Sequence, residues 1–542
     1  MASVRGFIGG FIIFAGVFFP GKLGAQFFLE QGLRLEYESF AARDTTNPNI
    51  PTALFPQNPG SDHPEFIRSC FRTGKVNLKT RKYGFFRKLL DESLIKVSDS
   101  AKGFSLSADP LFQFEWTNDQ NKPDTSYFRN TRGYRIRGSG KKFGFESWFL
   151  ENQSAFPDYI DSMVRVTGVV PGLGRWKKVK FKPYDFALAG GTFYFRACPN
   201  FEVSAGHGKF FVGNGYRSLF LSDNAFNYPF LKLQGSYKRF SHTLVQAVLM
   251  NLNSGGTKTP PFTERLFQKK PFQFQLLEYT IPGKISLGYF QGLIGAANDS
   301  MNHFRPGTSW FFPIPFVAPL INGFHGKENT VAGFNVYARV YKTLGIYGQW
   351  VVDGFPKGRV GGSLRNKQAW QAGINYLNVA GINNLHLRAE YNRARPYTYS
   401  HELPAQSWTH YNQALAHPLG GNFEEWYFSL SYRVHRFSVS LSLNMAHQGK
   451  DSLGNHFGSN PLQSDLNAFY GPESTINEMF QGRETNILNQ RAMVSYLVNP
   501  AYNFVLFAGA GVRESGQAGV KQKTPLVFFG LKTALWNQYL DF

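Results

Sequence analysis

Alternation of apolar and polar residues with a period of two is the feature of this sequence that most constrains its fold. Residues 436–447, RFSVSLSLNMAH, carry apolar side chains at the odd positions from Phe437 to Met445 and polar ones at the even positions from Ser438 to Asn444. Successive side chains of a β-strand point to opposite faces, so this segment predicts a strand with one apolar and one polar face. The apolar face must contact either a second sheet in a soluble sandwich or lipid.

The same alternation recurs in about eighteen segments, each near the nine to eleven residues that a tilted barrel strand needs. An even strand number is typical of single-chain bacterial barrels. Short links, such as 341–345 and 431–438, alternate with long ones. This sorting of loop lengths favours an up-and-down barrel over a sandwich. The predicted strands are 110–116, 132–142, 143–152, 188–197, 201–211, 229–239, 243–252, 272–281, 285–294, 331–341, 343–353, 370–378, 384–392, 425–434, 436–447, 488–498, 502–512 and 526–536, and the long links are 153–187, 295–330, 392–423 and 447–487.

Composition and the placement of charges indicate whether the apolar face contacts a second sheet or lipid. Aromatic residues make up 17% of the chain, and a lipid-facing wall with aromatic girdles accommodates them better than a soluble core. A basic residue on the lipid face at mid-depth costs about 2–4 kcal/mol, so Arg339 and Arg433 must point inward. The prediction is an all-β protein: an antiparallel transmembrane outer-membrane β-barrel of about eighteen strands, with a small N-terminal segment and long surface loops.

The N-terminus predicts export. Arg5 precedes an apolar run from Phe7 to Phe19, which is too short to span a bilayer and is typical of a cleaved signal peptide. We therefore predict a signal peptide at 1–25, an N-terminal segment at 26–104 that is either periplasmic or a plug, and the barrel at 105–542. Apolar residues at helical spacing predict a short helix within 83–97, which either caps the barrel mouth or forms a periplasmic arm.

Two cysteines, Cys70 and Cys198, are too few for a disulfide framework. An exported protein can join them, and two isolated buried thiols are the alternative.

The segment GHGKFFVGNG, 206–215, is rich in glycine but does not match a phosphate-binding loop. We interpret its glycines as a kink where a strand leaves the barrel wall. Polar residues that follow predict a network within the next loop, with a ligand contact as the alternative. This network comprises Arg217, Asp223, Asn224, Asn227 and Tyr228.

A second loop gathers His401, Glu402, His410 and His417 within a short stretch, which suggests zinc. The spacing is irregular and lacks H-E-x-x-H, so we favour a packed loop folded over the barrel mouth and held by its aromatic residues, and we predict no metal. We predict no cofactor and no catalytic residues either, because no nucleophile–base arrangement with supporting context is present.

A basic and aromatic stretch within 175–184 predicts the ligand-binding surface. An exported barrel makes nucleic acid an implausible partner, so positive charge at the cell surface points to lipopolysaccharide phosphates or an acidic glycan. Charge-assisted hydrogen bonds and ring stacking would hold the glycan, and a solvated loop is the alternative. The candidate glycan-binding residues are Arg175, Trp176, Lys177, Lys178, Lys180, Lys182 and Tyr184.

Two segments, 206–233 and 393–426, resemble the gliding-motility protein RemB family of outer-membrane proteins, which lies near the Wzi-type capsule-assembly barrels. Asn214 stands in GNGYRS where the family form GDGYRS has an acidic residue, so this chain lacks that charge. The resemblance implies an exported surface barrel tied to gliding or to polysaccharide attachment, and it carries over no enzymatic residues. Further matching segments are ENQSAFPDYID, VVPGLGR, DSLGNHFG and the terminal NQYLDF.

The predicted function is therefore non-enzymatic support of gliding motility, or of attachment or assembly of surface polysaccharide, with acidic glycan as the ligand. A channel for solute or polysaccharide is the alternative, and an outer-membrane enzyme is less favoured. The expected partners are outer-membrane lipid and lipopolysaccharide, acidic polysaccharide and other motility or surface components. Barrel-assembly machinery is also expected, because the terminal Phe542 would close the last strand.

Overall fold

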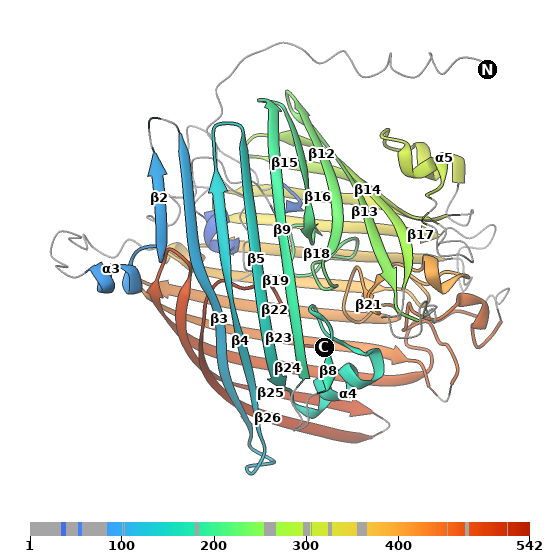
Figure 1. The fold of residues 1–542 in the computed structure, drawn as a ribbon. Coiled ribbons are helices and arrows are strands. Elements are labelled where there is room, and N and C mark those ends of the chain that lie inside the picture. Colours follow the sequence, from blue (N-terminus) through green and yellow to red (C-terminus); the bar gives the residue numbers. More distant parts are fainter. Residues whose placement is uncertain are drawn as a thin grey trace, which may run out of the picture.

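Eighteen antiparallel strands close into a barrel of the outer-membrane type, which confirms the predicted fold class (Figure 1). Wall strands are neighbours in chain order, and β26 returns to pair with β3. The computed structural model describes residues 34–39, 52–56, 84–99, 101, 103–178, 184–253, 267–295, 304, 306–322, 328–354, 366–452, 454–471, 476–517 and 519–542. The predicted signal peptide lies outside the described residues.

Each predicted strand has a counterpart in the wall. The wall strands are β3 Phe104–Asp119, β4 Ser126–Ser139, β5 Phe143–Ala155, β9 Tyr184–Cys198, β10 Phe201–Gly208, β12 Tyr228–Tyr237, β13 Phe240–Asn251, β14 Gln268–Ile281, β15 Ile285–Ile294, β16 Asn329–Tyr341, β17 Leu344–Gly354, β18 Lys367–Leu377, β19 Leu385–Ala394, β22 Phe423–Val434, β23 Phe437–Lys450, β24 Arg483–Asn499, β25 Phe504–Gln517 and β26 Val520–Lys532.

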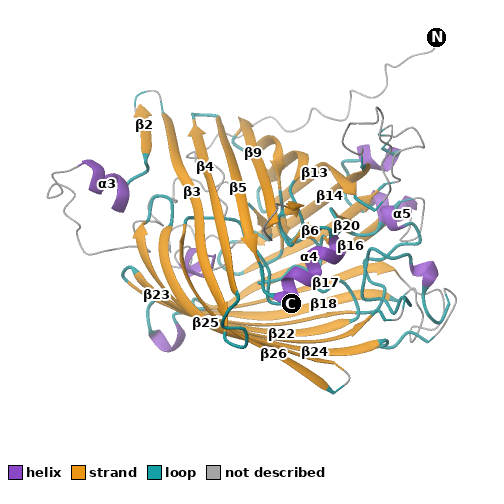
Figure 2. Ribbon diagram, turned by 60° about the horizontal axis from the view of Figure 1, so that its bottom comes forward, coloured by secondary structure: helices purple, strands orange, loops and turns teal. Residues whose placement is uncertain are grey.

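Shorter elements decorate the wall. They are β1 Leu54–Phe55 with β11 Phe211–Val212, β6 Val169–Val170 with β7 Gly174–Arg175, β20 Thr409–His410 with β21 Gln413–Ala414, β2 Ile95–Asp99 on β3, β8 Lys177–Lys178 on β9, the helices α3 Gly84–Leu90, α4 Asp158–Thr167 and α5 Val317–Asn322, and the 3₁₀ turns η2 Thr308–Phe311, η3 Val379–Gly381, η4 Pro404–Gln406 and η5 Asp465–Asn467 (Figure 2). Among the described helices, none is long and apolar enough to span a membrane.

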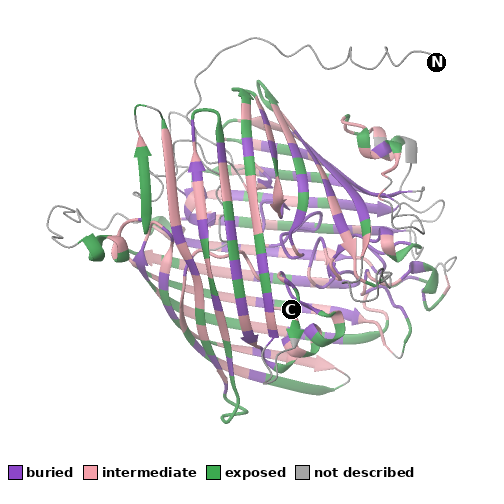
Figure 3. Ribbon diagram, in the orientation of Figure 1, coloured by how far each residue is buried: buried purple, intermediate pink, exposed green. Residues whose placement is uncertain are grey.

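Exposed and more buried residues alternate along the wall strands (Figure 3), as expected when successive side chains point to the outer and inner faces. On β23, Phe437, Val439 and Leu441 are exposed on the outer face, whereas Asn444 is buried on the inner face. Arg433 points inward and forms an ion pair at 2.8 Å with Glu36, which belongs to a helical turn at 34–39. The apolar band therefore faces lipid and the polar band faces the lumen.

An arginine on β4 is an exception to the inward placement. Arg132 lies on the outer face, since its parity matches the exposed Phe128 and Tyr134. Glu151 lies opposite it on β5, so the pair of residues places opposite charges side by side across the two strands.

The two ends of the barrel differ in loop length. Tight turns such as 342–343 and 435–436 join strands at one end, and long loops such as 156–183 and 395–422 join them at the other. The chain enters β3 and leaves β26 at the short-turn end. This asymmetry matches the predicted sorting of links, and it places long loops on the surface that an outer-membrane barrel presents outward.

One local prediction was wrong. The last strand ends at Lys532, so Phe542 does not close it, and residues 533–542 instead turn back into the barrel, where the C-terminus lies (Figure 1). The short helix predicted within 83–97 is confirmed as Gly84–Leu90, and Ile95–Asp99 after it pairs with β3 as a strand. Its alternating Ile95 and Val97 fit a strand period as well as a helical one.

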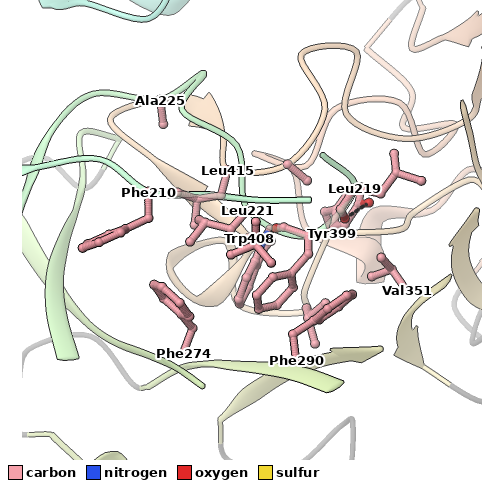
Figure 4. Close-up of a cluster of buried hydrophobic side chains, with 14 of the residues drawn as sticks. Phe210, Leu219, Leu221, Ala225, Phe274, Phe290, Val351, Tyr399, Trp408 and Leu415 are labelled. Carbon is pink, nitrogen blue, oxygen red and sulfur yellow. Dashed lines mark hydrogen bonds between the residues drawn. The ribbon is translucent and has the colours of Figure 1, made fainter. Parts of the chain in front are cut away.

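A cluster of buried hydrophobic side chains forms a core inside the barrel (Figure 4). It joins the loop after β10 to the loop after β19 and to the inner faces of β14 to β17. Trp408 is central to it: its ring packs against Phe220 and Phe272, and its Nε1 donates a hydrogen bond to the carbonyl of Phe220 at 2.6 Å. The core inside the barrel is thus formed by loops that pack against the wall as in a globular domain.

Candidate functional site

Two loops enter the lumen and form the core of the site. We name residues 209–227, between β10 and β12, the first plug loop, and residues 395–422, between β19 and β22, the second plug loop. The prediction that a strand leaves the wall near 206–215 is confirmed, since β10 ends at Gly208. Gly215 permits a close approach to the wall, because a Cβ there would lie 2.2 Å from a carboxylate oxygen of Glu390.

Two wall carboxylates hold the first plug loop. Glu390, on β19, accepts hydrogen bonds from the backbone N–H groups of Tyr216 at 2.7 Å and Arg217 at 3.0 Å, and from the hydroxyl of Tyr347 at 2.8 Å. Glu425, on β22, accepts from Asn444 at 2.7 Å. A buried carboxylate is tolerated when its oxygens are fully hydrogen-bonded, and both groups meet that condition.

Arg217 is the centre of the charge network. Its Nη2 lies 2.9 Å from a carboxylate oxygen of Glu425 and 2.9 Å from one of Asp541, and the side chain is 1% exposed. Burial alone would lower the pKa of the guanidinium, but the carboxylates of Asp541 and Glu425 outweigh it and raise that pKa well above its ordinary value. The first plug loop, the wall and the C-terminal residues are thus joined at one cation.

The C-terminal tail, residues 533–542, is the third luminal segment. The hydroxyl of Tyr539 donates to Asp223 at 2.7 Å, and the amide of Asn537 donates to the same carboxylate at 2.9 Å. Trp536 packs on Trp148 of the wall, with ring centroids 3.8 Å apart. The tail therefore lies between the first plug loop and β5 and contacts both.

The helical turn at 34–39 is the fourth luminal segment. Arg34 donates to the carbonyl of Gly213 at 2.6 Å, and its guanidinium lies over the ring of Phe55 at 3.9 Å. Burial lowers the pKa of Arg34 to about 10, with Glu38 acting in the opposite direction. Glu38 in turn accepts from Asn375 of β18 at 2.9 Å, so the turn bridges the first plug loop and the wall.

The predicted loop network is drawn together, but largely by partners outside its own loop. Arg217 and Asp223 bind the wall and the tail, as described above, and the amide of Asn224 donates to the carbonyl of Ala414 in the second plug loop at 3.3 Å. The hydroxyl of Tyr228 accepts from the backbone N–H of Phe210 at 3.3 Å. Asn227 presents its backbone carbonyl to His410 at 3.2 Å. A ligand contact for these residues stays a prediction.

Each histidine of the second plug loop forms its own hydrogen bonds within the fold. Backbone N–H groups of Leu403, Met250 and Leu419 donate to Nδ1 of His401, His410 and His417, at 3.1, 2.9 and 3.2 Å respectively. Nδ1 is thus an acceptor, which places the proton on Nε2. His417 uses that proton to bond Glu425 at 2.8 Å. Within the described residues, no three metal-ligating side chains gather.

Acid should therefore loosen the second plug loop. Burial lowers the pKa of all three histidines, that of His410 to about 3. Below pH 6.5 the unfolded loop binds protons that the folded loop excludes, so its stability is full above that pH and declines as the pH falls toward 3. We expect faster proteolysis of 395–422 at pH 5 than at pH 7.5 in purified protein. A His410→Gln variant should show a weaker pH response, whereas His435→Gln, in an exposed turn, should respond like the wild type.

The candidate glycan-binding stretch lies at the long-loop end. Arg175 and Lys177 are exposed, and Arg175 lies over the ring of Phe267 at 4.7 Å. Trp176 and Tyr184 pack edge to face, with centroids 4.6 Å apart, in a cluster under α4. Lys178 belongs to β8, whose backbone pairs with β9. Lys180 and Lys182 lie outside the described residues, and glycan binding by the whole stretch stays a prediction.

Sequence reasoning missed the tail and the helical turn as luminal segments. Their contacts join residues hundreds of positions apart, such as Arg217 with Asp541, and no local pattern signals such a pair. A signal that was present is the polar and aromatic composition of NQYLDF directly after the last strand pattern. Cys198 is free and exposed, while Cys70 lies outside the described residues.

Comparisons with solved structures identify the fold. Wzi, an outer-membrane protein involved in group 1 capsule assembly in Escherichia coli and a carbohydrate-binding β-barrel, matches 95% of this chain and 100% of its own, with a TM-score of 0.53 and 12% identity. OccAB2 of Acinetobacter baumannii (TM-score 0.42, 10% identity, 79% of this chain and 97% of that one) and the outer-membrane protein OprD of Pseudomonas aeruginosa (0.40, 11%, 79% and 93%) are less similar. No family model and no curated protein matches the sequence. The likeness to Wzi shows an outer-membrane β-barrel fold.

Proposed function

We propose that this barrel binds an acidic polysaccharide at the cell surface through the cations of 175–182, and so supports attachment or assembly of a surface polysaccharide layer. The observation that carries the proposal is the packing of the two plug loops inside the barrel. Inward groups such as Gln349 and Gln371 are buried and hydrogen-bonded to the first plug loop. Loops packed inside a barrel obstruct passage of solute, so they support a function in binding by the outer loops.

Two further points support a glycan ligand. Arg175 and Lys177 are exposed on the loop between β5 and β9, at the end that carries the long loops. Cations at this position attract polyanions and form charge-assisted hydrogen bonds with carboxylates. Wzi, whose fold this chain shares, is itself a carbohydrate-binding barrel. The aromatic members of the stretch pack on one another, so the proposal relies on its cations.

The test is the partition of surface polysaccharide between cells and medium. A strain should carry a variant with Arg175, Lys177, Lys178, Lys180 and Lys182 all changed to Gln. We expect polysaccharide in the medium to rise severalfold with total synthesis unchanged, because the polyanion loses its counter-charges. Gliding, which the resemblance to the RemB family makes the second process of interest, should be scored in the same strains.

A matched control removes five cations from the opposite end of the barrel. Lys141, Lys142, Lys238, Lys284 and Lys342 are exposed at short turns, and changing them to Gln alters the net charge equally. This control strain should retain its polysaccharide. Equal shedding in both strains would mean that net charge, and not this loop, holds the glycan; full retention in the loop variant would remove the loop from the mechanism.

A further inference from the structure

A cavity of about 300 Å³ lies in the lumen beside the tail. Strands β3, β4, β24, β25 and β26 form its wall, and α4, which lies next to the C-terminus in Figure 2, contributes Tyr159 and Ile160. This volume is at the lower end of the range for small-ligand pockets. The cavity lies apart from the plug loops' hydrophobic core, and none of the cations of 175–182 is among its described lining residues.

Positive charge predominates on the cavity wall. Four cationic side chains line it, Arg129, Arg491, Arg513 and Lys532, against the carboxylates of Glu115 and Asp541. Asp541 is already paired with Arg217. The carboxylate of Glu115 accepts from Gln113 at 2.8 Å and from Thr117 at 3.2 Å. Four cations thus line the cavity against two carboxylates, one of which is paired with Arg217, so positive charge is in excess.

The arginines are oriented by aromatic rings. The guanidinium of Arg491 lies 4.1 Å from the ring centroid of Phe528, and that of Arg513 lies 4.5 Å from the centroid of Tyr159. A ring covers one face of a guanidinium and leaves its in-plane N–H donors available for a carboxylate or phosphate. The stacking thus preorganises the arginines without using their donors.

Arg491 and Arg129 keep N–H groups that are available to a ligand. Arg129 donates through Nη1 to the side chain of Gln538 at 2.8 Å, whereas in the described part of the chain Arg491 has no hydrogen-bond acceptor and neither arginine forms an ion pair. Both lie close enough to Glu115 to attract its carboxylate electrostatically. Arg491 points inward and yet is exposed, which means that the space before it is open to water.

We propose that this cavity is a binding site for a small organic anion, with a carboxylate or phosphate held by Arg491 and Arg129 and a body the size of one sugar unit. Arg513 lines the same space, and its Nε donates to a main-chain oxygen of Phe542 at 3.0 Å. The site is distinct from the surface cations that we propose for polysaccharide, because neither Arg175 nor Lys177 lines it.

Calorimetric titration of the purified barrel in detergent tests the site. The probes are D-glucuronate, glucose 6-phosphate and, as a neutral body of the same size, D-glucose. We expect saturable binding of at least one anion and at least tenfold weaker binding of D-glucose. Binding of glucuronate alone would identify a carboxylate site, and binding of glucose 6-phosphate alone a phosphate site.

Variants locate the binding. Arg491→Gln should weaken anion binding at least tenfold, and Arg491→Lys should lie between it and the wild type, because lysine keeps the charge but loses the planar donor pair. Arg132→Gln, on the outer face of β4, should bind like the wild type, as should the five-cation loop variant described above. Equal binding of glucose, no binding of either anion, wild-type affinity in Arg491→Gln, or loss of binding in the loop variant would each overturn the proposal.

Discussion

Replacing Arg217 by Ala is expected to lower the free energy of unfolding by about 3–5 kcal/mol, as measured by urea titration of the purified barrel in detergent. The physical reason is the charge that remains. Glu425 and Asp541 both lie within 2.9 Å of the guanidinium, and Glu425 is fully buried. Without the cation, Glu425 retains only neutral donors such as Asn444, which do not offset the cost of burying its charge.

A second substitution separates the loss of charge pairing from loss of packing. The double variant Arg217→Met with Glu425→Gln removes both charges and roughly preserves volume, so it should be more stable than Arg217→Ala. Lys122→Ala, which breaks an ion pair between two exposed side chains, serves as the control and should have no measurable effect. If the double variant is less stable than Arg217→Ala, the buried carboxylate is not the cause of the loss.

The tail provides an independent readout of the same substitution. Asp541 loses its cation in Arg217→Ala, while Tyr539 keeps its bond to Asp223. We therefore expect carboxypeptidase to remove the last residues of the variant faster than those of the wild type. Equal digestion rates would mean that the tail is held by its aromatic packing alone.

The wall was predictable because the information that specifies it is local. In β23, the alternation from Phe437 to Met445 identifies both the strand and the face that contacts lipid, and the inward position of Arg433 follows from the cost of a cation in hydrocarbon. Loop lengths gave the topology in the same way, since each short link predicts an antiparallel neighbour. The errors in the wall are confined to the ends of strands. The last strand, for example, ends at Lys532, and Thr533 begins the tail, which is not part of the wall.

The lumen was only partly predictable because its contacts are distant in sequence. The kink near Gly208 and the polar residues after it indicated that the first plug loop is structured, but nothing in GNGYRS indicates that Arg217 meets Glu425 and Asp541. The second plug loop was predicted to fold over the mouth. It enters the lumen instead, because its aromatic residues, Trp408 above all, find an apolar surface on the inner faces of β14 and β15 that the strand pattern does not reveal.

Removing Trp408 should have an effect of the same order as removing Arg217, by a different mechanism. The indole is 0% exposed, packs against Phe220 and Phe272, and lies over Gly292, where a Cβ would stand 2.2 Å from the ring. Trp408→Ala leaves a cavity, and the rigid barrel wall cannot relax to fill it. We therefore expect a loss of about 3–5 kcal/mol in the free energy of unfolding. Trp408→Phe should cost less, because most of the ring volume remains.

The same variant tests whether the closed lumen matters for function. Trp370 is 37% exposed on the outer face of β18, and Trp370→Ala provides a tryptophan control that leaves the luminal core intact. In planar bilayers we expect little ion conductance from the wild type and from Trp370→Ala, and higher conductance from Trp408→Ala, since a loosened second plug loop opens a path past its core. High conductance from the wild type would instead favour the channel alternative, because a barrel that already passes ions does not depend on Trp408 to close it.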